Sequence, residues 1–109
     1  MSLSSIIGEG AASDSLIGSR ISAKGGVGIL GFQIVSTSLD AADAVFKIQQ
    51  TNYPEDPTSW IDTPAATLTI ASGTDVNVIA LDVLKLGSSY FRFNYDAGAN
   101  TTGTIKVIV

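Results

Sequence analysis

The chain has 109 residues, with 10 acidic and 6 basic side chains, a net charge of −4, and neither cysteine nor histidine. It therefore has no thiolate nucleophile and no disulfide, and it lacks the commonest side chain for general-base catalysis and transition-metal binding. The acidic balance also argues against a nucleic-acid partner, because phosphate-binding surfaces are basic. The length is that of one domain, and we expect a non-enzymatic protein without a cofactor.

The first thirty residues differ in composition from the rest. Seven of the eleven glycines lie at or before Gly31, whereas all eight aromatic residues lie from Phe32 onward. This difference predicts an extended Gly/Ser-rich N-terminal arm over residues 1–25 and a β-sandwich domain over residues 26–109. We expect the arm to order through assembly contacts with neighbouring subunits; the alternative is that it folds back on its own domain. The apolar residues available for assembly are Leu3, Ile6, Ile7, Leu16 and Ile17.

From Phe32 onward, short apolar runs alternate with turn residues. Many of these runs have the two-residue period of a strand with one buried face, as in 89–95, where Phe91 and Phe93 share one face. Strands of this length and spacing predict an all-β fold, an antiparallel β-sandwich of jelly-roll type with about seven or eight strands. The expected strands are 31–36, 44–50, 60–62, 67–70, 75–81, 89–95 and 103–109, with one helical turn at 82–86 that Gly87 ends. Within the N-terminal segment, residues 16–17 and 20–21 could form one further strand that pairs with the main sheet.

The loop between 50 and 60 contains a first candidate for ligand binding. Tyr53 and Trp60 lie at its ends, with two prolines between them that stiffen the backbone. An exposed pair of this kind could stack on a sugar ring. We favour a core role for Trp60, because Ile61 continues a strand from it, and keep sugar binding as the alternative.

The outward face of strand 89–95 is a second candidate. Tyrosine and arginine are enriched in protein contacts, so a stripe containing them is suited to a partner or a ligand. The same stripe is equally compatible with a face that simply meets solvent. It consists of Tyr90, Arg92 and Asn94.

Two further patterns are interpreted without a function. Residues 26–31 match G-x-G-x-x-G, but a strand and not a helix is expected next, so no dinucleotide cofactor is predicted. The ten carboxylates form no compact calcium-binding loop, and we predict no metal site, leaving open only a weak calcium site on the surface.

Part of the chain resembles small β-sandwich structural proteins of bacteriophage virions. The resemblance lies in runs 46–49, 60–62, 90–95 and 103–109. It implies a jelly-roll-like protein of the capsid decoration or head-fibre type, located in the virion and made in the host cytoplasm. The partners that it implies are copies of the same chain and other virion proteins, such as a major capsid protein.

We therefore expect a non-enzymatic structural subunit of a phage particle that assembles through its N-terminal arm and its sandwich faces. One alternative is a β-sandwich module that binds carbohydrates or a host surface, with surface glycans as partners. Another is a tail or fibre component of the virion. No membrane partner is expected, because no run approaches the ~20 apolar residues of a membrane-spanning helix.

Overall fold

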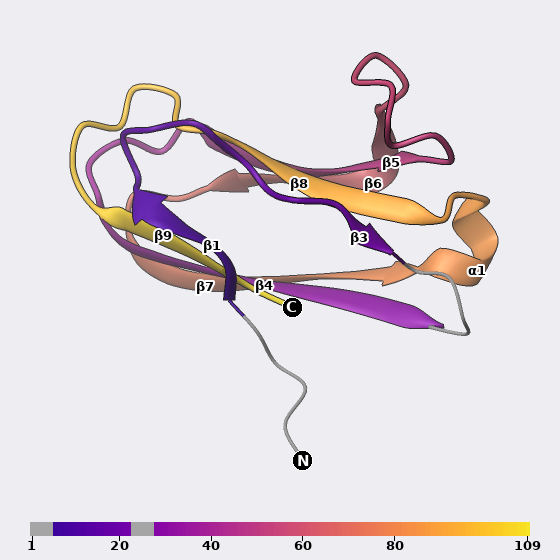
Figure 1. Ribbon diagram of the computed structural model, residues 1–109. Coiled ribbons are helices and arrows are strands. Elements are labelled where there is room, and N and C mark those ends of the chain that lie inside the picture. Colours follow the sequence, from indigo (N-terminus) through magenta and orange to yellow (C-terminus); the bar gives the residue numbers. More distant parts are fainter. Residues whose placement is uncertain (1–5, 23–27) are drawn as a thin grey trace.

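The computed structural model describes residues 6–22 and 28–109, which form two antiparallel β-sheets packed face to face (Figure 1). The four-stranded sheet has the order β1-β9-β4-β7, and the five-stranded sheet has the order β2-β8-β5-β6, with β3 also paired to β8. The elements are β1 (Ile6–Ala11), β2 (Leu16–Ile17), β3 (Ile21–Ser22), β4 (Ile29–Leu39), β5 (Ala44–Thr51), β6 (Ile61–Ile70), β7 (Gly73–Asp82), the single helical turn α1 (Val83–Leu86), β8 (Tyr90–Asp96) and β9 (Thr104–Ile108).

The strand order confirms the predicted all-β sandwich of jelly-roll type. When β2 and β3 are counted as one interrupted strand, each sheet interleaves strands from the two halves of the chain as an eight-stranded jelly roll does. Residues 6–22 and 28–109 form nine separate strands, more than the predicted seven or eight, because residues 6–22 contribute three short strands of their own.

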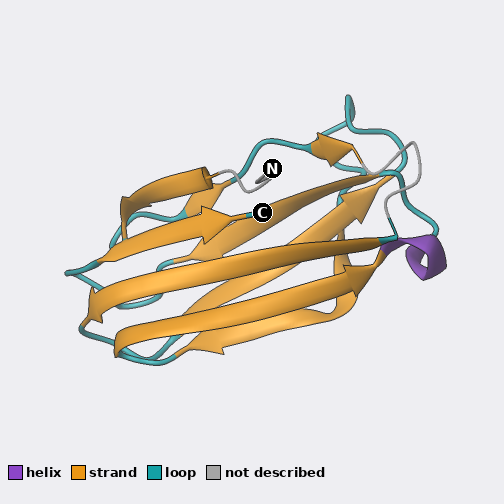
Figure 2. Ribbon diagram, turned by 90° about the horizontal axis from the view of Figure 1, so that it is seen from below, coloured by secondary structure: helices purple, strands orange, loops and turns teal. Residues whose placement is uncertain are grey.

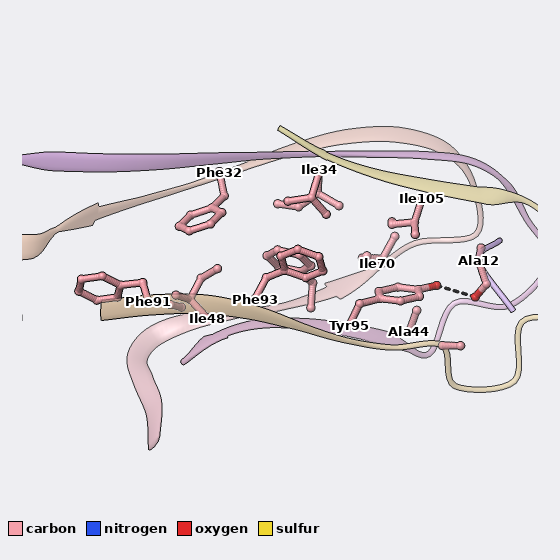
Figure 3. Close-up of a cluster of buried hydrophobic side chains, with 14 of the residues drawn as sticks. Ala12, Phe32, Ile34, Ala44, Ile48, Ile70, Phe91, Phe93, Tyr95 and Ile105 are labelled. Atoms are coloured by element: carbon pink, nitrogen blue, oxygen red, sulfur yellow. Dashed lines mark hydrogen bonds between the residues drawn. The ribbon is translucent and has the colours of Figure 1, made fainter. Parts of the chain in front are cut away.

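The core lies between the inner faces of the two sheets (Figure 3). Phe91 and Phe93 point into it from β8, as the alternation predicts, and Phe46 of β5 stacks on Phe93 with ring centroids 5.5 Å apart. The Tyr95 hydroxyl donates a hydrogen bond to the Ala12 carbonyl at 2.8 Å, so the most polar large group of the core has a partner. Burial of each such large apolar side chain contributes roughly 1.5–3 kcal/mol.

Residues 6–22 belong to the sandwich, so the prediction of an extended arm is wrong for them, whereas the expected pairing of the segment near 16–21 with the main sheet is present. β1 pairs with β9, and β2 and β3 pair with β8. Gly8 and Gly18 lie so close to the ring of Phe93 that a Cβ on either would clash with it. The glycines that suggested an extended arm here allow close packing, and the alternative of a segment folded back on its own domain is what the structure shows.

The predicted assembly residues divide between core and surface. Ile7 and Leu16 pack against the buried core, whereas Ile6 and Ile17 are exposed. Leu3 lies outside the described residues. The described part of this segment makes its contacts with its own sandwich, which removes the reason for expecting it to order on a neighbouring subunit.

Residues 61–62 of the predicted run 60–62 and the whole run 67–70 are parts of one strand, β6, and Trp60 lies just before it. Its pairing with β5 is interrupted between Asp62 and Thr67, where Pro64 and Ala65 lie and where Ala65 has a positive φ of 59°. This bulge breaks the two-residue period and explains why the sequence pattern indicates two strands. The helical turn is as predicted: α1 ends at Gly87, whose φ of 73° is left-handed.

Candidate functional site

The outer face of the five-stranded sheet brings together polar side chains from three strands. In the sheet register, Gln49 of β5 lies opposite Arg92 of β8 on one side and opposite Asp62 of β6 on the other. Because successive side chains of a strand point to opposite faces, the residues between the core positions of β5 point outward. We call this surface the Trp60 face; it consists of Trp60, Arg92, Gln49, Asp62 and Lys47.

The side chains of the Trp60 face form one continuous chain of contacts. The guanidinium carbon of Arg92 lies 4.4 Å from the ring centroid of Trp60, and Arg92 Nε donates to Gln49 Oε1 at 2.9 Å. Gln49 Nε2 in turn donates to Asp62 Oδ1 at 3.1 Å. Lys47 Nζ donates to Asp62 Oδ2 at 3.3 Å. Side chains held in this way lose less conformational entropy when a ligand binds.

Gln49 is the centre of this network. Its side chain is buried between its neighbours, and its amide uses both ends: the oxygen accepts from Arg92 and the nitrogen donates to Asp62. Gln49 therefore fixes the orientation of two more exposed charged groups.

The charges of the Trp60 face are only partly compensated. The hydrogen bond from Gln49, together with Lys47, holds the pKa of Asp62 below its ordinary value of 3.8, so the carboxylate is ionised at neutral pH. Partial burial lowers the pKa of Arg92 from its ordinary value. Two cations thus share this surface with one carboxylate.

The loop between β5 and β6 rises beside the Trp60 face, and in Figure 1 it projects above the sandwich. The hydroxyls of Thr51 and Ser59 lie 2.7 Å apart across its base. Asn52 ties the loop to the segment after α1, because its amide donates to Gly87 O and accepts from Ser89 N, both at 2.9 Å. These bonds give the loop a fixed shape.

The same loop is also joined to the N-terminal segment. Arg20 Nη1 lies 3.3 Å from Glu55 Oε1, and the Arg20 guanidinium lies over the ring of Tyr90 at 5.6 Å. This ion pair crosses the end of β8. It extends the polar surface beyond the Trp60 face without adding net charge.

The structure brings some of the predicted contact residues together and separates others. Trp60 is half-buried and lies outside the buried core, so the favoured core role is wrong: its indole packs against Arg92 on the outer face. Tyr53 is 61% exposed on the adjoining loop. The outward stripe of β8 is as predicted, and Asn94 lies in register with Lys47.

The sequence prediction missed Gln49, Asp62 and Lys47 as site residues. The signal that existed was the alternation in 44–50, which places Lys47 and Gln49 opposite the core positions. The contact with Asp62 depends on the register between β5 and β6, and the bulge in β6 shifts that register.

Two carboxylates outside the Trp60 face have structural partners. Asp40 accepts from the Thr101 backbone N at 2.8 Å and from the Thr101 hydroxyl, and these bonds lower the pKa of Asp40. Asp43 accepts from the Ala99 N at 3.0 Å. Both therefore hold the loop between β8 and β9.

Among residues 6–22 and 28–109, no group of three acidic side chains could hold a metal ion, and no helix is long and apolar enough to span a membrane.

A hollow of about 240 Å³ lies on the opposite outer face, that of the four-stranded sheet. Residues of β1, β9 and β4 line it, and its charged groups, Glu9 and Lys106, pair with each other at 3.6 Å. No aromatic side chain belongs to the lining. The hollow therefore lacks the combination of an aromatic ring with charged and amide groups that the Trp60 face has.

No family model and no curated protein matches the chain. Solved structures do match its fold. The K1 cleaved adhesin domain of Lys-gingipain from Porphyromonas gingivalis W83 has a TM-score of 0.55 and 13% identity, covering 92% of this chain and 70% of that one. The K3 cleaved adhesin domain of the same protein has a TM-score of 0.52 and 14% identity, with coverage of 91% and 68%. A CBM4 structure has a TM-score of 0.54 and 16% identity; the match covers 85% of this chain and 56% of the CBM4 chain. These likenesses show the fold, a two-sheet antiparallel β-sandwich.

Proposed function

We propose that this protein is a non-catalytic binding module for a saccharide and that the Trp60 face is its binding surface. The observation that carries the proposal is the continuous chain of contacts from Trp60 through Arg92 and Gln49 to Asp62 and Lys47. It places an aromatic ring, hydrogen-bond donors and an acceptor on one partly exposed, preoriented surface.

The chemistry of these groups suits a sugar. A pyranose presents hydroxyls that both donate and accept, together with an apolar ring face. The carboxylate of Asp62 accepts only, whereas Lys47 and Arg92 donate only, so the face can satisfy hydroxyls of either orientation. Trp60 supplies a flat apolar surface beside them.

Arg92 leaves the Trp60 face with one net positive charge, but the ion pairs of the other cations favour a neutral saccharide over a polyanion. Lys47 is paired with Asp62, and Arg20 at the edge of the same face is paired with Glu55. An anionic ligand would have to compete with these carboxylates. A neutral ligand can use the same groups as hydrogen-bond partners without breaking an ion pair.

The fold supports the proposal at a coarser level. Jelly rolls occur in lectin domains, and two of the matched sandwiches are adhesin domains while a third is named as a carbohydrate-binding module. Binding by these proteins is consistent with a binding role here, and the assignment to a saccharide rests on the Trp60 face itself.

Isothermal titration or affinity electrophoresis against a panel of neutral and acidic polysaccharides tests this proposal. We expect Trp60→Ala and Lys47→Ala each to weaken binding of a neutral saccharide at least about tenfold, equivalent to about 1.4 kcal/mol. The matched control is Lys106→Ala, because Lys106 also forms an ion pair on an outer face, but on the other sheet. Absence of binding to every saccharide, or equal losses for Lys47→Ala and Lys106→Ala, would contradict the proposal.

The resemblance to phage structural proteins leaves a second proposal, a repeated subunit of a virion. The jelly-roll strand order favours it, because viral capsid domains also use this architecture. Co-sedimentation with capsids assembled without this chain tests it: saturable binding at a fixed ratio to the capsid protein would support the proposal, and no binding would count against it.

A further inference from the structure

Three of the four edges of the two sheets carry features that block pairing with another chain. β2 and β3 are only two residues long each. β6 contains Pro64 and the bulge at Ala65, and β1 contains Glu9 and a register shift. The fourth edge, β7, has ten residues without proline or lysine, and its pairing with β4 is regular from Asp75 to Asp82. Of the described edges, β7 is the one open to a further strand (Figure 2, the strand that leads into the purple helical turn).

The open side of β7 presents the backbone groups of Val76, Val78 and Ala80. Alternate residues of an antiparallel strand bond to the same neighbour. Val83 N donates to Gly28 O at 3.1 Å. The backbone N–H and C=O groups of the odd-numbered residues of β7 therefore point toward β4, and those of the even-numbered residues point away from it. Val78 and Val76 are also 69% and 51% exposed. The unpaired backbone and the exposed apolar side chains therefore occur at the same positions.

We propose that two copies of this chain associate through β7, antiparallel about a two-fold axis, with Val78 opposite Val78 of the second copy. This register places Val76 opposite Ala80 and Thr74 opposite Asp82, so that the edge pairs over residues 74–82. In this register, the unpaired backbone N–H and C=O groups of one copy face the unpaired backbone groups of the other, as hydrogen-bonded pairs require. The two four-stranded sheets become one continuous sheet.

The charges of β7 permit a second copy in this register. The run 76–81 is uncharged, and it forms the centre of the paired region. The carboxylates of Asp75 and Asp82 lie toward its ends, where each meets an uncharged residue across the axis. Asp82 is also 3.8 Å from Lys85 Nζ, which offsets part of its charge. Like charges therefore do not face each other across the pair.

One edge group would exchange its partner. The Val76 N now donates to the side chain of Asp75 at 2.9 Å. In the pair, the carbonyl of Ala80 from the second copy accepts instead, and the carboxylate of Asp75 returns to water. The exchange replaces one hydrogen bond by another, while the apolar side chains of two edges gain cross-strand contacts.

The proposed pairing also fixes where the two Trp60 faces point. Strands that continue one sheet keep the same side of the sheet outward, so the two five-stranded sheets lie on one side of the dimer. Both Trp60 faces then look in the same direction. If the saccharide proposal holds, a dimer can engage one extended polymer at two places, and such bivalency raises avidity by about 10²–10⁴. The pairing through β7 itself does not rest on that proposal.

Sedimentation equilibrium of the full chain tests the pairing, and we expect the mass to approach twice 11.2 kDa as concentration rises. Val78→Pro removes the N–H that makes both bonds of the central pair, yet removes no bond to β4. We expect it to weaken association at least about tenfold, equivalent to about 1.4 kcal/mol. The matched control, Val78→Thr, keeps the N–H and the β-branched shape and should remain dimeric.

A second variant keeps the test decisive if the proline disturbs folding, which circular dichroism and the Tm would reveal. Val78→Lys places two like charges opposite each other across the axis, so it should also dissociate the pair, and added salt should partly restore it. A wild-type chain that stays monomeric at every concentration would overturn the proposal. So would a dimer that is equally stable in a folded Val78→Pro variant and in Val78→Lys.

Discussion

The two outer faces of the sandwich follow the same alternation of side chains but end in different chemistry. On the five-stranded sheet, the outward positions hold Arg92, Gln49 and Asp62, which bond to one another. On the four-stranded sheet, the outward positions of the β4–β7 half include Val76 and Val78, whose side chains are exposed. A preoriented polar face is suited to recognising hydroxyl groups, whereas an apolar face beside an open strand is suited to another copy of the chain. The two proposals thus assign ligand binding and association to different sheets of the sandwich.

The largest expected effect is a loss of stability from a substitution in the N-terminal segment. This segment packs against β8, which carries part of the Trp60 face. Gly18→Ala places a Cβ against the ring of Phe93, which cannot yield easily because it stacks on Phe46. We expect the free energy of unfolding to fall by roughly 1–3 kcal/mol. Urea denaturation measures it.

Gly10→Ala is the matched control, because a Cβ there meets nothing within 4 Å. It should leave the urea midpoint nearly unchanged. Equal midpoints for the two variants would mean that residues 6–22 do not pack on the sandwich as described.

The next effect sharpens the comparison between the two faces by changing the same residue type on each. Gln49→Ala removes the amide that orients Arg92 and Asp62, and we expect several-fold weaker saccharide binding. Gln33→Ala changes an exposed residue of β4 on the other face, and binding should stay the same.

Gln49 acts through its neighbours, so the readout must distinguish lost orientation from a general loss of structure. Gln49→Glu restores an acceptor for Arg92 but no donor for Asp62, and we expect it to recover part of the affinity. If Gln49→Ala and Gln33→Ala bind alike while both remain folded, the network does not position the ligand groups.

The smallest effect concerns pH. The pKa of Asp62 lies below 3.8 in the folded chain because Gln49 and Lys47 stabilise the carboxylate. Because this pKa is depressed, the ionised Asp62 stabilises the folded chain above pH 3.8, and this stabilisation is lost as pH falls through the folded-state pKa. Saccharide affinity should therefore stay constant from neutral pH down to about 4 and fall below that.

Asp62→Asn is the control for this pH dependence. The asparagine oxygen still accepts from Gln49 but does not titrate. This variant should bind slightly less well than wild type at neutral pH and should lose the acid-dependent decline that Asp62 causes. A decline that begins well above pH 4 in both proteins would assign the effect to another group.

The sequence predicts local features well and long-range ones poorly. The alternation in β8 correctly places Phe91 and Phe93 inward and Arg92 outward, because the two-residue period is a property of the strand itself. The same reasoning fails for Trp60, which follows a loop and precedes the edge strand, so that no alternating pattern around it shows which face it takes. It also fails for Gly8 and Gly18, since glycine composition alone does not reveal that an aromatic ring from β8 lies against them.

Only part of the candidate site can be predicted from the sequence, for the same reason. The alternation in β5 predicts that Lys47 and Gln49 point outward. Their contacts with Asp62 and Arg92 come from strand pairing over 13 and 43 residues of separation, which depends on the bulge in β6 and on the jelly-roll order.

The most direct test of the binding role is to titrate the isotopically labelled chain with a neutral oligosaccharide and follow its amide and indole resonances. The Trp60 face is predicted to carry the largest shifts: the indole N–H of Trp60, the side-chain amide of Gln49 and the backbone around Arg92. Resonances of Gln33 and Lys106 on the other outer face should not move. Shifts confined to the four-stranded sheet, or none with any saccharide, would contradict the account.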